Sequence, residues 1–247
     1  RSFRSAGSNP ALSARTIPHN GSRTGLPFVL FAYKETPMIP LEVARTFYAD
    51  RDPVHDFDHV LRVLALARRI AQAEGADLAI VETAVLLHDI HRVTEDEAAP
   101  GTGPDHAQLA ADQARTILAA LDPAPSPAFT EAVAHAIAAH RFRGSVEPQT
   151  LEARCVFDAD KLDAIGAIGV ARAYAYGARN GQKLWGEVPA GYDGTSPEHT
   201  PHHEFIYKLS RIPDRLMTET GRAIARERAA FMRAFFERLA AEVHGDA

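Results

Sequence analysis

From residue 40 onward, apolar residues recur every three or four positions along most of the chain, and no alternating pattern long enough for a strand appears. Val60, Leu64 and Ala67 show this spacing, which places apolar side chains on one face of a helix. The pattern predicts helices over residues 41–49, 56 or 57–74, from 78 to the pair 88–89, 105–121, 127–140, 151–177, 202–212 and 214–243, and glycines at 166 and 169 allow a break in the sixth. We therefore expect an all-α helical bundle with a long C-terminal helix.

Local signals mark several boundaries of these helices. Asp77 is placed to cap the helix that follows it, and Gly75 to end the preceding one. Residues 180–200 are rich in Gly and Pro and form the longest predicted loop of the compact region, a kind of segment that is often functional. The composition of residues 1–37 favours a disordered or non-native N-terminal extension. We expect one domain over residues 38–247.

Composition narrows the class of protein. The 247 residues are 46% hydrophobic and 24% charged, as in an ordinary globular protein, and the chain lacks the apolar run of about 20 residues that a membrane span needs. The net charge of -5 disfavours non-specific binding to nucleic acid, because surfaces that follow phosphates are normally basic. Cys155 is the single cysteine, which excludes an intrachain disulfide and fits a reducing compartment. We expect a cytoplasmic protein without nucleic-acid or membrane partners.

Four residues on or beside the predicted helices could form a metal site: His59, the adjacent pair His88 and Asp89, and Asp160. Two imidazoles and two carboxylates suit a divalent metal of borderline softness. Adjacent residues diverge by about 100° on a helix, so His88 and Asp89 reach one ion only if the helix ends there. Each piece alone is weak, because a histidine in an Ala-rich helix is more often packed than metal-bound. The combination carries the prediction.

The motifs around these residues resemble those of the HD-domain metal-dependent phosphohydrolase superfamily. The strings are His55-Asp-Phe-Asp-His59-Val-Leu-Arg62, Leu86-Leu-His88-Asp89-Ile90, Phe157-Asp158-Ala-Asp160-Lys161-Leu-Asp163, Phe205-Ile-Tyr-Lys208-Leu209 and Met217-Thr-Glu-Thr220. The resemblance extends over roughly residues 50–243, and in particular it is to small bacterial HD hydrolases related to nucleoside triphosphate pyrophosphohydrolases. It implies an HD-domain helical bundle.

By position, the resemblance implies that His59, His88, Asp89 and Asp160 ligate one divalent ion, which could be Mn, Mg, Co, Ni, Fe or Zn. Asp158 is the main alternative to Asp160, because the acidic cluster permits a two-residue shift of register. An ion held this way would polarise a phosphoryl oxygen and lower the pKa of water that attacks phosphorus. Asp89 or Asp163 would accept a proton if either keeps a free oxygen.

Three further histidines have open roles. His55 is either a ligand or a group that orients His59. His106 and His140 could support a second ion, or they could simply bond to the backbone at helix ends. His140, next to Arg141 at a helix end, is also a candidate for contact with substrate.

A nucleotide polyphosphate needs cations beyond the metal, because several anionic oxygens must be neutralised. The candidates lie beside the proposed metal residues or His140: Arg62, Arg92, Arg141 and Lys161. Arg62 and Lys161 would also stabilise charge on the leaving group. The alternative for each is an ordinary surface cation on a helix.

The expected activity is hydrolysis of nucleoside triphosphates to a monophosphate and pyrophosphate, which the resemblance to that subgroup implies. A nucleoside monophosphate phosphatase is the nearest enzymatic alternative. A non-catalytic metal- or nucleotide-binding regulatory module is the alternative of another class. The long C-terminal helix leaves a homodimer open.

Overall fold

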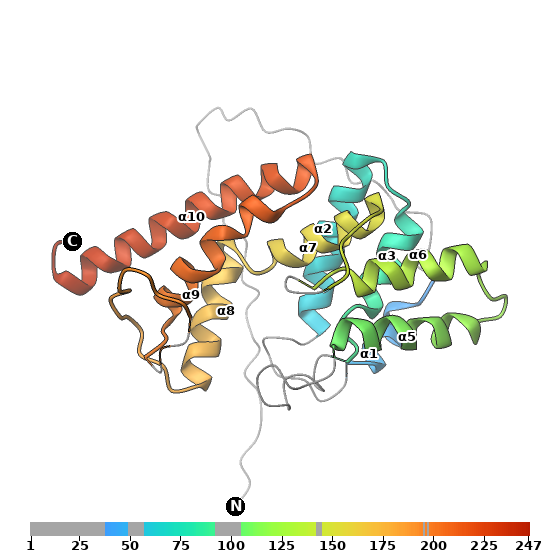
Figure 1. Ribbon diagram of the computed structural model, residues 1–247, viewed down its shortest axis with the longest axis horizontal. Helices are drawn as coiled ribbons and strands as arrows, with labels where there is room; N and C mark the ends of the chain where they lie inside the picture. Colours follow the sequence, from blue (N-terminus) through green and yellow to red (C-terminus); the bar gives the residue numbers. More distant parts are fainter. Residues whose placement is uncertain (1–37, 49–56, 92–104, 142–144, 195, 197) are drawn as a thin grey trace, which may run out of the picture. The chain divides into compact units, whose positions relative to one another are not determined.

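The computed structural model describes residues 38–48, 57–91, 105–141, 145–194, 196 and 198–247, all within the unit Glu35–Ala247 (Figure 1). All regular structure in these ranges is helical, which confirms the all-α prediction. The helices are α1 (Leu41–Thr46), α2 (Phe57–Glu74), α3 (Leu78–Leu87), α5 (His106–Ala119), α6 (Pro127–Ala138), α7 (Leu151–Leu162), α8 (Gly166–Arg179), α9 (Pro201–Tyr207) and α10 (Glu219–His244), with short 3-10 turns at Leu209–Arg211 and Pro213–Arg215. The predicted extension over residues 1–37 lies outside the described residues, and its division from residues 38–247 stays a prediction.

Two of the predicted helix ends bear directly on the metal site. Helix α2 covers Phe57–Glu74 as the apolar spacing predicts. The Asp77 side chain caps α3 by accepting hydrogen bonds from the backbone N–H groups of Ala79 and Ile80, at 2.9 and 3.3 Å. Helix α3 ends at Leu87, so His88 and Asp89 follow it directly. The predicted end of the helix at this pair is confirmed.

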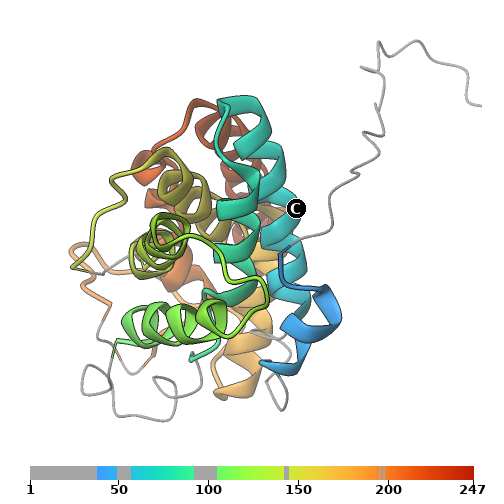
Figure 2. The same cartoon turned by 90° about the vertical axis from the view of Figure 1, so that its right-hand side faces the viewer.

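The core lies where α2, α3, α6 and α7 pack on one another. Helix α2 contacts both α3 and α7, and α3 contacts α6, which in turn lies beside α5 (Figures 1 and 2). Helix α3 is almost wholly apolar, and Leu86 and Leu87 at its end are fully buried. Burial of each leucine side chain contributes about 2 kcal/mol to stability. This packing fixes the position of the next two residues, His88 and Asp89.

Three predicted segments are refined by the structure. The helix predicted from about residue 202 to Pro213 ends at Tyr207 and is followed by a 3-10 turn. Residues 151–177, where Gly166 and Gly169 allow a break, form two helices, because α7 ends at Leu162 and α8 begins at Gly166. Gly166 has φ +81°, and a Cβ there would lie 2.9 Å from Cγ of Arg228, so this break needs a glycine. The C-terminal helix begins at Glu219 rather than at residue 214. Thr218 is extended and its hydroxyl caps the helix, accepting from the Gly221 N–H at 2.9 Å.

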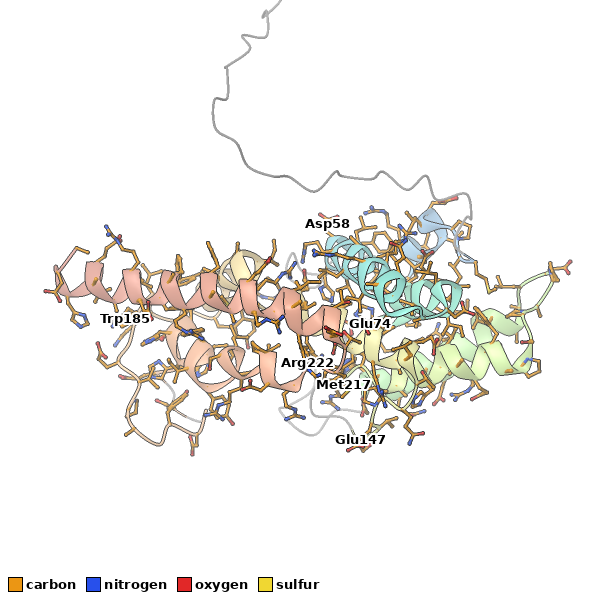
Figure 3. All side chains as sticks on the ribbon, turned by 90° about the horizontal axis from the view of Figure 1, so that it is seen from above. Asp58, Glu74, Glu147, Trp185, Met217 and Arg222 are labelled. Carbon is orange, nitrogen blue, oxygen red and sulfur yellow. The ribbon has the colours of Figure 1, made fainter. Side chains whose placement is uncertain are left out.

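Helix α10 begins on a buried carboxylate of α7. Asp158 is fully buried and accepts hydrogen bonds from Met217 N at 2.9 Å, Thr218 N at 2.8 Å and Thr218 Oγ1 at 2.6 Å. On the other side, Glu74 of α2 accepts from Thr220 N at 2.7 Å, and Figure 3 shows Glu74 and Met217 beside the start of α10. Asp158 therefore points at the start of α10, and the alternative that it replaces Asp160 as a metal ligand is wrong.

No helix among the described residues has the length and apolar character needed to cross a membrane.

Replacing Asp158 with alanine should strongly destabilise the fold. The variant would leave two backbone N–H groups and a hydroxyl unpaired where α10 begins, and each such loss costs about 1–3 kcal/mol. We expect the free energy of unfolding in urea to fall by about 3 kcal/mol or more. The control is Asp112→Ala at an exposed carboxylate, which should change it by less than about 1 kcal/mol. Similar small changes in both variants would contradict the anchoring role.

Candidate metal centre

The four predicted metal residues come from three helices and meet in one place. His59 lies in the first turn of α2, His88 and Asp89 directly follow α3, and Asp160 lies near the end of α7. His59 Nε2 is 3.4 Å from Asp160 Oδ1 and 3.9 Å from Asp89 Oδ2. His88 Nε2 is 3.7 Å from Asp89 Oδ2 and 3.9 Å from Asp160 Oδ1. His59, His88 and Asp89 form a group whose ligand atoms all lie within 4.8 Å of one another, and Asp160 Oδ1 adjoins both of its imidazoles. No side chain of the four is more than 13% exposed.

Hydrogen bonds on the far side of each ring fix the orientation of the two imidazoles. His88 Nδ1 lies 2.8 Å from the carbonyl oxygen of Val85, which can only accept, so Nδ1 carries the proton. His59 Nδ1 lies 2.7 Å from Asp163 Oδ2 and donates to that carboxylate. In its neutral tautomer His88 turns its Nε2 lone pair toward Asp89 and Asp160. Burial lowers the pKa of His59, but its bonds to Asp160 and Asp163 raise it overall, so an ion bound here would displace a proton from His59 Nε2.

His88 Nε2 is the clearest sign that this volume suits a cation. Among the described residues, it is the one buried side-chain nitrogen or oxygen without a hydrogen-bond partner. A buried acceptor left in this state costs about 1–3 kcal/mol, and a cation between the rings and the carboxylates would satisfy it. Mn, Fe, Co, Ni and Zn accept mixed imidazole and carboxylate ligands, whereas Mg and Ca prefer sites made of oxygen ligands alone. The donors present here therefore fit the first group of metals better.

The charge states of the cluster also fit a metal site. Burial lowers the pKa of His88 to about 4, so its Nε2 is unprotonated at neutral pH. Burial opposes ionisation of Asp160, but Lys161 holds the pKa of that carboxyl well below its usual value. Lys161 Nζ contacts Asp160 Oδ2 at 2.6 Å, while Oδ1 faces the imidazoles. Lys161, predicted to bind phosphate, therefore forms an ion pair with Asp160 and neutralises its charge.

Asp163 lies behind His59 and is almost fully buried, at 1% exposure. Its Oδ1 accepts from Arg62 Nε at 2.8 Å, and its Oδ2 accepts from His59 Nδ1, Arg62 Nη2 at 3.1 Å and Arg172 Nη1 at 2.9 Å. The condition for Asp163 as a proton acceptor, a free oxygen, is not met. Arg62, predicted to contact substrate, is bonded to Asp163, and its contact with substrate stays a prediction. Arg172 was not predicted, because its contact joins two helices and leaves no local spacing in the sequence.

A second group of possible ligands shares Asp89 with the first. Asp89 Oδ1 lies 3.4 Å from His140 Nε2 and 3.5 Å from His106 Nε2, and these two nitrogens are 3.3 Å apart. His140 Nδ1 donates to the carbonyl oxygen of Ile137 at 2.6 Å, which turns its Nε2 lone pair toward Asp89. The three residues could hold a second ion, and all are buried. His140 therefore lies in a buried group of possible metal ligands.

The remaining predicted site residues are Arg141, Arg92 and His55. Arg141 Nη1 pairs with Asp105 Oδ2 at 3.3 Å, so it links the residue after His140 to the cap of the helix that begins with His106. Arg92 and His55 lie outside the described residues, and their predicted roles stay predictions.

Comparison with known proteins is consistent with this geometry. The family model for the HD domain matches residues 56–165, the range that contains all four predicted ligands. The Bacillus subtilis protein YpgQ, described as uncharacterized, is 34% identical over 205 residues, which cover 81% of this chain and 90% of YpgQ. This chain belongs to the HD-domain family. It is an HD-family metal-dependent phosphohydrolase.

Solved structures of HD proteins share the fold. The crystal structure of Bacillus subtilis YpgQ in complex with ADP has a TM-score of 0.63 at 29% identity, and the match covers 84% of this chain and all of that one. A predicted HD superfamily hydrolase from an uncultured Thermotogales bacterium has a TM-score of 0.58 at 32% identity, over 82% of this HD protein and 90% of the other. An HD-superfamily hydrolase from Bacillus thuringiensis has a TM-score of 0.60 at 26% identity, over 83% and 94%.

The depressed pKa of His88 should make the metal-free HD domain lose stability in mild acid. Between pH 6.5 and about 4 the unfolded chain binds a proton at this residue while the folded chain does not, so stability falls as pH falls. The contribution of His88 is about 3 kcal/mol across that window. Urea unfolding of EDTA-treated protein at several pH values should therefore give a shallower pH dependence for His88→Gln than for wild type. Equal slopes would contradict the buried, neutral state.

Proposed function

We propose that this HD protein hydrolyses nucleotides, with one divalent ion held by His59, His88, Asp89 and Asp160. The observation that carries the proposal is His88 Nε2, a buried lone pair without a partner that faces two carboxylates. A purely structural helical protein would have no reason to leave this nitrogen unsatisfied. When bound, the ion supplies Lewis-acid polarisation of a phosphoryl oxygen and makes water more acidic.

The chain's own residues prepare this site for phosphoryl chemistry. Asp163 holds the ring of His59, and Lys161 keeps Asp160 ionised. Asp89 Oδ2 faces His59 and His88, whereas its Oδ1 faces His106 and His140. Of the two oxygens, Oδ1 is therefore the one better placed to accept a proton. Burial of these groups strengthens each electrostatic interaction compared with water.

Nucleotides are the proposed substrate class. Support comes from the YpgQ structure, because that relative of similar fold binds ADP. We further propose cleavage of nucleoside triphosphates between the α- and β-phosphates, giving a monophosphate and pyrophosphate. Cations for the phosphate oxygens would come from Arg92, and from Lys161 and Arg141, each of which makes an ion pair with a neighbouring carboxylate. Arg62 is the least available of the predicted cations, because two of its nitrogens bond to the buried carboxylate of Asp163. A homodimer stays a prediction.

Two other functions remain as outcomes of the test. A nucleoside monophosphate phosphatase would use the same metal residues but release orthophosphate. A regulatory module would bind metal or nucleotide without turnover. The presence of all four proposed ligands in one buried cluster favours an enzyme over the module.

Product analysis tests the proposal directly. We expect wild-type protein with added Mn²⁺ to convert at least one nucleoside triphosphate of a panel to monophosphate and pyrophosphate, as followed by phosphorus NMR. Asp89→Asn should lower kcat/KM by more than about 100-fold, beyond the range for changes to residues behind a metal ligand. Asp112→Asn, an exposed carboxylate on α5, is the matched control and should keep wild-type activity.

Each other result has a defined meaning. Orthophosphate alone would rule out the pyrophosphohydrolase in favour of a phosphatase. Background turnover in wild type and Asp89→Asn alike would favour the regulatory module.

A further inference from the structure

Asp163 connects three helices at a single buried carboxylate. It follows the end of α7, and its donors are His59 and Arg62 of α2 and Arg172 of α8. Oδ2 alone receives three of these bonds, including the one from His59 Nδ1. We propose that Arg172, acting through Asp163, is a positioning residue that aims His59 Nε2 at the metal site. This inference rests on the metal binding proposed above.

Arg172 holds Asp163 in two places at once. Its Nη1 lies 2.9 Å from Asp163 Oδ2 and 3.3 Å from the carbonyl oxygen of the same residue. A donor shared between the side chain and the main chain of one residue fixes the direction of that side chain relative to its backbone. Arg172 therefore determines where the acceptor for His59 Nδ1 lies.

Arg62 bonds to the same carboxylate but has a different effect. It shares α2 with His59, so the two donors move together when that helix moves. Arg172 comes from α8 and thus ties the acceptor to another part of the fold. Helix α10 adds to this restraint, because Arg228 Nη1 donates to the carbonyl oxygen of Leu162 at 2.5 Å, one residue before Asp163.

The consequence for His59 is a fixed tautomer and a fixed ring. A metal-binding imidazole is oriented by the group bonded to its other nitrogen, and such partners affect metal affinity about 10- to 100-fold. If Asp163 turned away, His59 Nδ1 would lose its acceptor and the ring could rotate. Asp160 lies three residues before Asp163, near the same end of α7. Arg172 and Arg228 therefore restrain the proposed ligand Asp160 as well as Asp163, which holds His59.

Cobalt binding to EDTA-treated protein tests the role of Arg172. We expect Arg172→Met to weaken Co²⁺ affinity by about 10- to 100-fold in calorimetry and to alter the visible absorption of bound Co²⁺, which reports ligand geometry. Arg172→Lys keeps the charge but not the planar fork, and should fall between wild type and Arg172→Met. The control is Arg115→Met, which likewise removes a guanidinium bonded to carboxylate, here of Glu131 and Asp112, but on the exposed surface of α5 and α6. It should match wild type.

A double variant separates positioning from general support of the fold. If Arg172 acts through Asp163, then Arg172→Met should add less than about twofold to the loss of affinity caused by Asp163→Asn alone. Fully additive losses would overturn the inference. Should Arg172→Met fail to fold, Arg172→Lys decides: reduced affinity supports the inference, and wild-type affinity overturns it.

The outcomes also distinguish this inference from the proposed function. Wild-type protein that binds no Co²⁺ and no Mn²⁺ would overturn the metal site itself. Wild-type protein that binds Co²⁺, with Arg172→Met equal in affinity and absorption, would overturn only the role of Arg172.

Discussion

The hydrogen bond on the outer nitrogen of each imidazole is the constraint on which the metal centre depends. His59 donates to Asp163, while His88 and His140 donate to the carbonyl oxygens of Val85 and Ile137 in the preceding turn. Each bond fixes which ring nitrogen carries the proton and where the other one points. Lone pairs from separate helices therefore converge beside Asp89 in a region that water hardly reaches. Such a region gains stability when it holds a cation.

The rest of the fold holds these rings and carboxylates in fixed positions relative to one another. Burial of the end of α3 fixes His88 and Asp89, and packing of α2 on α3 and α7 brings in His59 and Asp160. Helix α10 is bonded to α7 on both sides of Asp160. The start of α10 donates to Asp158 of α7, and Arg228, further along α10, donates to the carbonyl oxygen of Leu162. The C-terminal helix is thus part of the framework of the site, although it contributes none of the four proposed ligands.

Sequence alone predicted the helices and the group of four residues, because apolar periodicity and motif spacing are local properties. It favoured Asp160 through the family resemblance but kept Asp158 as an alternative, since both are acidic and lie two residues apart. On a helix, residues two apart point about 200° from each other, so only one of them could face the histidines. Arg62 was predicted to contact substrate, but it is bonded to Asp163. Ion pairs between helices depend on tertiary packing, which also explains why Arg172 was missed.

Anomalous X-ray diffraction from crystals grown with Mn²⁺ is the most direct test of the central claim. The account predicts a strong peak within coordination distance of His59, His88, Asp89 and Asp160. A further peak beside His106 and His140 would add a second ion without changing this result. The absence of any peak among His59, His88, Asp89 and Asp160 at saturating Mn²⁺ would contradict it.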